Sequence, residues 1–404
     1  MSSQAPALGE RGLLPDVSNF SLVLGGPLFQ FLVRAHLSDD ALLHVRQRII
    51  VMASLAWLPL LLLSALQGQL VGGSAAVPFL MDIEVHVRFL VALPLLIGAE
   101  LVAHRRMRPI LKTFLDRQLI SEGAMPRFDA AVASALRLRN SMLAEALLIG
   151  FVYTVGVLIV WRHFIALDAA TWYSTPSGDG STLSLAGIWF VLVSLPAFQF
   201  LLLRWYFRMF IWVRLLWQLS RIDLRLVPTH PDHLGGLGFL PGTVHAFAIL
   251  AAAHGVLLAG YIANRIFYVG TALTEFQLEM AIMVVFLECV VLGPLLVFAP
   301  QLSQTRRSGL REYGTLAQRY VREFDAKWLR GGAPAGEPLM GSGDIQSLAD
   351  LGNAHQAVTA MSIVPVTKTA IVELAIATLV PVAPLLLTMM PLEELLKKML
   401  GILL

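Results

Sequence analysis

The sequence has 404 residues, of which 57% are hydrophobic and 14% are charged. Soluble domains carry about 25% charged residues, so this composition, with a mean hydropathy of +0.71, excludes an ordinary soluble domain and indicates a membrane protein. The net charge of +3 does not indicate nucleic-acid binding. The basic residues stand beside apolar segments, where retention of positive charge on the cytoplasmic side explains them.

Seven apolar segments are each close to the roughly 20 residues that a helix needs to cross the hydrocarbon of a bilayer. The first six are predicted at about 49–71, 87–103, 142–165, 184–203, 243–263 and 276–299. The seventh, at 369–390, contains Pro381 and Pro384, which remove backbone donors and favour a kink or a re-entrant segment. We therefore predict an all-α polytopic transmembrane helical bundle of six or seven spans with helical cytoplasmic loops.

Lysine and arginine are distributed unevenly between the connecting segments. Twenty-five of the 30 lie in the segments 1–48, 104–141, 204–241 and 300–368. The intervening segments 72–86 and 166–183 contain none. The positive-inside rule then places the N-terminus in the cytoplasm. Seven crossings put the C-terminus outside, whereas a re-entrant last segment returns it, with Lys397 and Lys398, to the cytoplasm.

These boundaries divide the chain into four parts. Residues 1–48 are predicted to be a cytoplasmic or interfacial N-terminal segment, and residues 49–299 the transmembrane bundle. Residues 300–368 are predicted to be a cytoplasmic helical region, and residues 369–404 a last transmembrane or re-entrant segment with an amphipathic tail. Within the bundle, 104–141 is predicted to be a helical cytoplasmic loop. The segment 204–241 is predicted to be interfacial, because aromatic rings and arginines gather at the headgroup level.

The cytoplasmic region is predicted to contain two helices. An amphipathic stripe covers 309–329, and a break rich in glycine and proline follows at 331–343. A second helix is expected after Asp344, which is a good N-cap residue. These helices are candidate docking surfaces for a cytoplasmic protein partner.

The densest polar motif is PTHPDHLGGLGFL at 228–240. His230, Asp232 and His233 carry imidazole and carboxylate groups that can bind a metal or relay a proton. A metal site needs three or four ligands, and no cysteine or further histidine lies nearby in the sequence. We therefore predict no metal site and identify no cofactor. The other interpretation is a structural turn, in which His230 and Asp232 hydrogen-bond the backbone.

Five ionisable residues are predicted within or at the ends of the spans: Glu100, Glu145, His254, Glu288 and Glu373. A charge in hydrocarbon is costly, so such groups usually face a partner or water. Together they are candidates for a pathway for ions or protons. The alternative is that they lie at headgroup depth or form pairs that hold the bundle together. Glu288 and His254 are the strongest candidates because they lie near the middle of their spans.

Two motifs carry a resemblance to a known group of proteins. The motif at 228–240 and the segment EPLMGSGDIQSLADL at 337–351, followed by IVP at 363–365 and PLEE at 391–394, resemble an uncharacterised family of bacterial polytopic inner-membrane proteins. The resemblance covers most of the chain from residue 184 onward. It implies a bacterial inner membrane, and it implies no particular chemistry.

The leading functional prediction is an oligomeric ion channel or an ion-coupled transporter, and an enzyme is not favoured. One alternative is a membrane-embedded enzyme that uses His230, Asp232 and His233 at the cytoplasmic interface. Another is a membrane scaffold or sensor. The expected partners are membrane lipids and further copies of this chain.

Overall fold

The structure is a computed structural model that describes residues 20–34, 44–72, 77–156, 171–177 and 180–389. Its α-helices are α1 (Pro27–Arg34), α2 (Val45–Leu66), α3 (Ile83–Val87), α4 (Leu93–Asp116), α5 (Met125–Arg139), α6 (Met142–Phe151), α7 (Leu185–Trp189), α8 (Leu195–Leu219), α9 (Thr243–Val269), α10 (Gln277–Val291), α11 (Ala299–Phe324), α12 (Gly343–Ala360) and α13 (Lys368–Leu379). One antiparallel hairpin is formed by β1 (Ser174–Ser177) and β2 (Gly180–Leu183).

Short π-helical and 3₁₀ segments extend several of these helices. The π segments are Arg88–Ala92, Phe190–Ser194, Asp325–Leu329 and residues 152–156, which follow α6. The 3₁₀ segments are Phe79–Met81, Glu122–Ala124, Leu240–Gly242, Leu273–Phe276, Gly293–Phe298 and Val380–Thr388. The first two π segments join α3 to α4 and α7 to α8 without a break. Both resulting helices are longer than the apolar segments from which they were predicted.

Five helices are long and apolar enough to cross a membrane, and the number rises to seven if each of two bent helix pairs is one span. The five are Val45–Leu66, Ile83–Asp116, Leu185–Leu219, Leu240–Val269 and Lys368–Thr388. The bent pairs are Glu122–Arg139 with Met142–Gly156, at 47°, and Leu273–Val291 with Gly293–Leu329, at 41°. The predicted all-α polytopic bundle is confirmed, and the chain is a multi-pass integral membrane protein.

The packed centre of the bundle lies along α4, α8 and α9. Trp205, Trp212, Leu215 and Phe247 are each at most 2% exposed and belong to one continuous hydrophobic cluster. Trp205 and Trp212 of the segment 204–241 therefore pack inside the protein, whereas Phe210 and Trp217 of the same segment are about half exposed. The position of this segment at the headgroup level stays a prediction.

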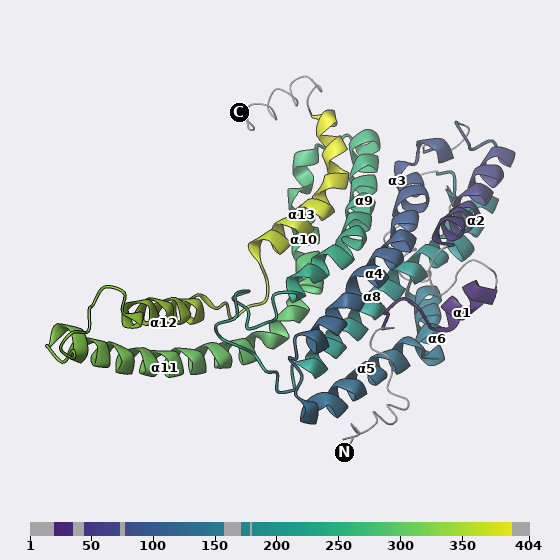
Figure 1. The fold of residues 1–404 in the computed structure, drawn as a ribbon. Coiled ribbons are helices and arrows are strands. Elements are labelled where there is room, and N and C mark those ends of the chain that lie inside the picture. Colours follow the sequence, from purple (N-terminus) through teal and green to yellow (C-terminus); the bar gives the residue numbers. More distant parts are fainter. Residues whose placement is uncertain (1–19, 35–43, 73–76, 157–170, 178–179, 390–404) are drawn as a thin grey trace, which may run out of the picture.

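The last candidate span, Lys368–Thr388, runs along α9 and α10 (Figure 1). Its backbone approaches α9 closely at Gly255, where an added Cβ would collide with the Thr378 carbonyl oxygen. Small residues at helix interfaces allow this kind of approach in membrane proteins. Residues 390–404, which include the predicted amphipathic tail, lie outside the described part of the chain.

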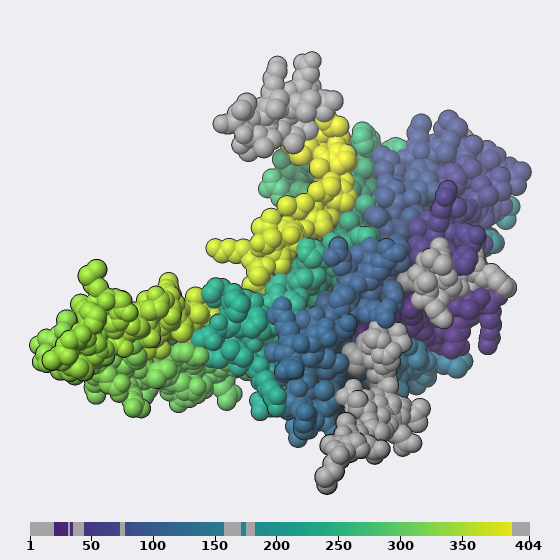
Figure 2. Space-filling view, viewed as in Figure 1, coloured from purple at the N-terminus to yellow at the C-terminus, as the bar shows by residue number. Residues whose placement is uncertain are grey.

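A helical hairpin, which we call the arm, projects from the bundle (Figure 1) and stands apart from it as a protrusion (Figure 2). It consists of α11 with its extension to Leu329, a connecting segment, and α12. The two helices predicted in this region are present. The second begins at Gly343, however, and its N-cap is Ser342, whose hydroxyl accepts a hydrogen bond from the Asp344 N–H at 3.1 Å.

The Asp344 side chain holds the two halves of the arm together. Its Oδ2 accepts hydrogen bonds from Lys327 Nζ and Trp328 Nε1, each at 2.9 Å. The Asp344 carbonyl oxygen accepts a third from the Tyr320 hydroxyl at 3.0 Å. Asp344 is therefore a tertiary contact and not the cap that its position in the sequence indicated.

Candidate functional site

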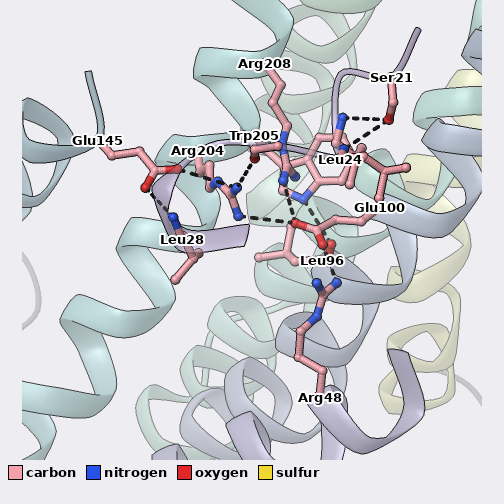
Figure 3. Close-up of polar contacts among 12 residues, drawn as sticks. Ser21, Leu24, Leu28, Arg48, Leu96, Glu100, Glu145, Arg204, Trp205 and Arg208 are labelled. Atoms are coloured by element: carbon pink, nitrogen blue, oxygen red, sulfur yellow. Dashed lines mark hydrogen bonds and ion pairs between the residues drawn. The ribbon is translucent and has the colours of Figure 1, made fainter. Parts of the chain in front are cut away.

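Five charged side chains from four helices meet in one buried cluster (Figure 3). The cluster, which we call the buried charge cluster, consists of Arg48 of α2, Glu100 of α4, Glu145 of α6, and Arg204 and Arg208 of α8. All five side chains are at most 9% exposed. Arg204 and Arg208 are four residues apart, a spacing that places both on one face of α8.

Glu100 is the centre of the buried charge cluster because three guanidinium groups approach its carboxylate. Arg208 Nη2 lies 2.7 Å from Glu100 Oε1, and Arg204 Nη1 lies 3.8 Å from the same oxygen. Arg48 donates a short hydrogen bond to Oε2 (Figure 3). Glu100 therefore ties α2 and α8 to α4.

Glu145 provides the second carboxylate of the cluster. Its Oε1 lies 3.5 Å from Arg204 Nη2, and its Oε2 accepts a hydrogen bond from the Leu28 N–H at 2.7 Å. Glu145 lies in the first turn of α6, whose N-cap is Ser141. Arg204 thus bridges two carboxylates, and the contact with Leu28 attaches the N-terminal helix α1 to the same site.

The buried charge cluster lies towards the arginine-rich end of the bundle. At about 1.5 Å per residue, Glu100 lies roughly 25 Å along its helix from Ile83, and Arg204 lies roughly 28 Å along its helix from Leu185. Arg48 lies roughly 27 Å from Leu66, the other end of α2. Since bilayer hydrocarbon is about 30 Å thick, all three distances place the cluster near one edge of the hydrocarbon.

The charges of the cluster do not balance, because three guanidinium groups face two carboxylates. Among the described residues, Arg48 Nε and Arg208 Nη1 lack a hydrogen-bond acceptor, whereas Arg208 Nη2 faces Glu100. The Arg208 guanidinium also stacks over the Trp205 ring at 5.0 Å. A buried site with excess positive charge and unused N–H donors is suited to an anion.

His254 lies on the other side of α8 and is 4% exposed. Its Nε2 lies 2.6 Å from the Tyr206 hydroxyl, and its Nδ1 lies 2.8 Å from the Leu250 carbonyl oxygen. Because a carbonyl only accepts, Nδ1 carries the proton and Nε2 accepts from Tyr206 when the ring is neutral. Both ring nitrogens are therefore satisfied within the protein.

The two other predicted carboxylates are more exposed. Glu288, on α10, is partly exposed, and no hydrogen bond or ion pair joins its side chain to another described residue. Glu373, on α13, lies with Oε2 3.5 Å from His245 Nδ1, and both side chains are about half exposed. The structure thus brings Glu100 and Glu145 together and separates both from His254, Glu288 and Glu373.

The 228–240 loop is organised around the Asp232 carboxylate. Oδ1 accepts from the backbone N–H groups of Leu234 and Gly236 at 2.9 and 3.1 Å, and Oδ2 accepts from that of Gly238 at 2.8 Å. Arg117 Nη1 lies 3.1 Å from Oδ2. Partial burial raises the pKa of Asp232, but the three N–H groups outweigh it and hold the pKa below its usual value.

The two histidines of this loop support the same turn. His230 Nδ1 lies 2.8 Å from Asp232 Oδ1. His233 has a left-handed backbone, with φ of 52°, and its carbonyl oxygen accepts from the Ser362 N–H at 2.7 Å. These contacts support the structural-turn interpretation, and a chemical role for the histidines stays a prediction. Within the described ranges, no group of three or more His, Cys, Asp or Glu side chains is placed to hold a metal ion.

Sequence reasoning missed the three arginines of the buried charge cluster and Tyr206. The arginines follow apolar segments, so they were interpreted as headgroup anchors and orientation signals. One signal was present: the four-residue spacing of Arg204 and Arg208 puts both on one face of a helix whose neighbouring residues are aromatic. Their carboxylate partners lie about a hundred and about sixty residues away in the chain, which no local pattern reveals.

Comparison of the chain with protein-family models, with curated proteins and with solved structures gives no match. The family resemblance of the two sequence motifs therefore stays a prediction, and the function must be argued from the geometry of the chain itself.

Proposed function

We propose that this protein moves an anion across the membrane, as an ion channel or an ion-coupled transporter. The observation that supports this most is the buried charge cluster. It carries one more guanidinium group than carboxylates, at the edge of the hydrocarbon, in side chains that are at most 9% exposed.

An uncompensated charge at this depth costs several kcal/mol. An anion beside Arg208 would neutralise the excess charge and accept from N–H groups that have no well-oriented acceptor among the described residues. Arginine stays protonated at every physiological pH. The anion site would therefore keep its positive charge over the whole physiological pH range.

A purely structural role for the cluster is the competing explanation, and the variant Arg208→Gln separates the two. It leaves two guanidinium groups facing two carboxylates, so a structural cluster would be balanced and the protein would fold. A transport site would lose its anion. We expect anion flux to fall at least tenfold, and Arg208→Lys, which keeps the charge, to retain more flux than Arg208→Gln.

The measurement is flux through purified protein in liposomes, with chloride, nitrate, phosphate and benzoate compared with sodium, potassium and protons. Arg319→Gln is the matched control, because the Arg319 side chain is 79% exposed on the arm. Glu288→Gln tests the mid-span carboxylate separately. Wild-type flux in Arg208→Gln would contradict the role of the cluster. If the wild-type protein conducts none of these ions, the transport proposal is wrong.

Orientation and assembly are proposed on the same basis. The family resemblance of the sequence motifs supports a bacterial inner membrane, and the positive-inside rule supports an N-terminus in the cytoplasm. A homo-oligomer is supported by α10, where the Glu288 side chain has no partner in the described part of the chain and the apolar side chains of Leu278, Ile282 and Val285 are each more than half exposed. A second copy of the chain would cover this face.

The arm supports a second candidate function, a membrane scaffold or sensor. It projects from the bundle (Figure 2), and its far end exposes apolar side chains, including Met340 at 88% and Leu329 at 70%. An interfacial enzyme at His230, Asp232 and His233 has less support. The Asp232 oxygens already accept from three backbone N–H groups and lie against Arg117.

A further inference from the structure

A pocket lies at the end of the bundle opposite the arginine-rich end. It is bounded by α3 and its π-helical extension, by the last turns of α9, and by the chain around Thr171–Tyr173. Its volume is about 230 Å³. A cavity of about 150 Å³ lined by apolar side chains is enough to hold benzene, so this pocket has room for one aromatic ring with a substituent.

Aromatic rings form much of the wall of this pocket. Tyr173 and Phe190 lie on one side, with ring centroids 5.8 Å apart, and Tyr261 and Tyr268 of α9 complete the lining. The Tyr268 hydroxyl donates to the Met81 carbonyl oxygen at 2.5 Å, which fixes its ring. Flat apolar bodies pack well against such rings.

The acidic residues of the lining are already engaged with other groups. Asp82 Oδ1 accepts from Asn264 Nδ2 at 2.9 Å, and Oδ2 accepts from Trp172 Nε1 at 2.9 Å. Glu84 forms an ion pair with Arg88, one turn further along the same helix. Asp82 is 6% exposed and Glu84 is paired, so neither carboxylate is placed to contact a ligand directly.

Among the described lining residues, Arg265 is the charged residue that is exposed. Its guanidinium lies 5.2 Å from the centre of the Tyr261 ring, and it forms no ion pair within the described part of the chain. A guanidinium that is held against an aromatic ring keeps its fork of N–H groups free for a carboxylate. The pocket thus combines an aromatic wall with an arginine at its edge that has no ion-pair partner among the described residues.

We propose that this pocket binds a small organic anion with a flat apolar body and a carboxylate, of the size of a substituted benzoate. The ring lies between the aromatic side chains, and Arg265 binds the carboxylate. This assignment rests on the proposed function, since it gives the class of anion that the protein moves. Its test measures binding and not flux, so the two proposals fail independently.

The experiment uses the full-length protein in lipid nanodiscs and measures benzoate binding by isothermal titration calorimetry. Empty nanodiscs correct for partition of benzoate into lipid. Benzamide is the neutral ligand of the same shape, and benzylamine is the cationic one. We expect saturable binding of benzoate, and at least tenfold weaker binding of benzamide and benzylamine.

Arg265→Gln is the decisive variant, because Arg265 is exposed and its substitution leaves the packing of α9 intact. We expect at least a tenfold higher Kd for benzoate, a partial recovery with Arg265→Lys, and no change with Arg225→Gln at the arginine-rich end. Phe190→Ala should weaken benzoate and benzamide equally, because it removes a wall and no charge.

Equal affinity for benzoate and benzamide, or an unchanged Kd in Arg265→Gln, would overturn the assignment. Absence of benzoate binding by a protein that still conducts anions would reject this pocket and leave the transport proposal intact. Benzoate binding that depends on Arg265, without flux of any ion, would support the pocket and reject transport.

Discussion

Arginine occurs in three different environments in this protein, and each allows a different behaviour. Arg204 is enclosed between two carboxylates. Arg208 is equally buried, and its Nη1 has no acceptor among the described residues. Arg265 is exposed against a tyrosine ring. Arg208 and Arg265 each have N–H groups that can bind a ligand, and for this reason they carry the two proposals.

Asp232 gives a prediction of pH dependence. Its folded pKa is below the usual value of 3.8, so it contributes stability that is fully present above pH 3.8 and is lost as the pH falls through the folded pKa. Asp232→Asn should lower the unfolding free energy at pH 7 by roughly 1–3 kcal/mol, since a charged acceptor is lost. The difference from wild type should shrink below about pH 4.

Thermal unfolding of the purified protein in detergent, at several pH values, measures this difference. Asp223→Asn is the matched control, because Asp223 lies in the same connecting segment and is exposed. An Asp232→Asn protein as stable as wild type at pH 7 would mean that the carboxylate does not organise the 228–240 loop.

At the scale of the elements, helices of the bundle are joined by close backbone approach as well as by charge. Gly255 on α9 faces Thr378 on the last candidate span, and Gly260 faces Val87 at the end of α3. Both glycines lie inside a helix, where glycine costs roughly 1 kcal/mol relative to alanine. Their presence is explained by the space that neighbouring helices need.

Gly255→Leu should therefore separate α9 from the last candidate span. An added side chain meets the Thr378 carbonyl and then Pro381, and overpacking of this kind costs typically 1–3 kcal/mol. We expect a lower melting temperature in detergent and faster proteolysis of the C-terminal segment. Gly98→Ala on α4 is the control, since nothing lies within 4 Å of the added Cβ, and it should melt like wild type or higher.

The sequence predicted some features of this fold and site and could not predict others. The lengths of the apolar segments located the helices, and the turn residues around Asp232 indicated the loop. The bends of 47° and 41° within the two bent helix pairs could not be predicted from the sequence. The pattern of apolar residues indicates how long a helix is, and it does not indicate the direction in which the helix runs. The pairing of Arg204 with Glu100 was missed because it depends on which helices are neighbours. The charge rule treats every arginine alike, whether it faces water or a buried carboxylate.

At the scale of the whole molecule, the bundle and the arm have different surfaces. The bundle presents apolar side chains such as Leu62 and Leu147, as expected of a protein in lipid. The arm carries its apolar side chains on a segment that projects from the bundle (Figure 1). Tyr320 and Trp328, which belong to the first of the two predicted docking helices, bind Asp344 within the arm.

A partner of the arm should therefore contact its outer apolar residues and not Tyr320 or Trp328. A photo-reactive residue at position 340 or 329 should crosslink, in native membranes, to a second protein if the arm is a docking surface. Position 346 on α12, where Gln346 bonds only to Asp350 of the same helix, is the control and should give little product. The double variant Leu329→Ser with Met340→Ser should bind the crosslinked protein more weakly at an unchanged melting temperature, because both side chains are exposed. Crosslinks to lipid alone would show that the arm lies on the membrane, and they would remove the support for a scaffold.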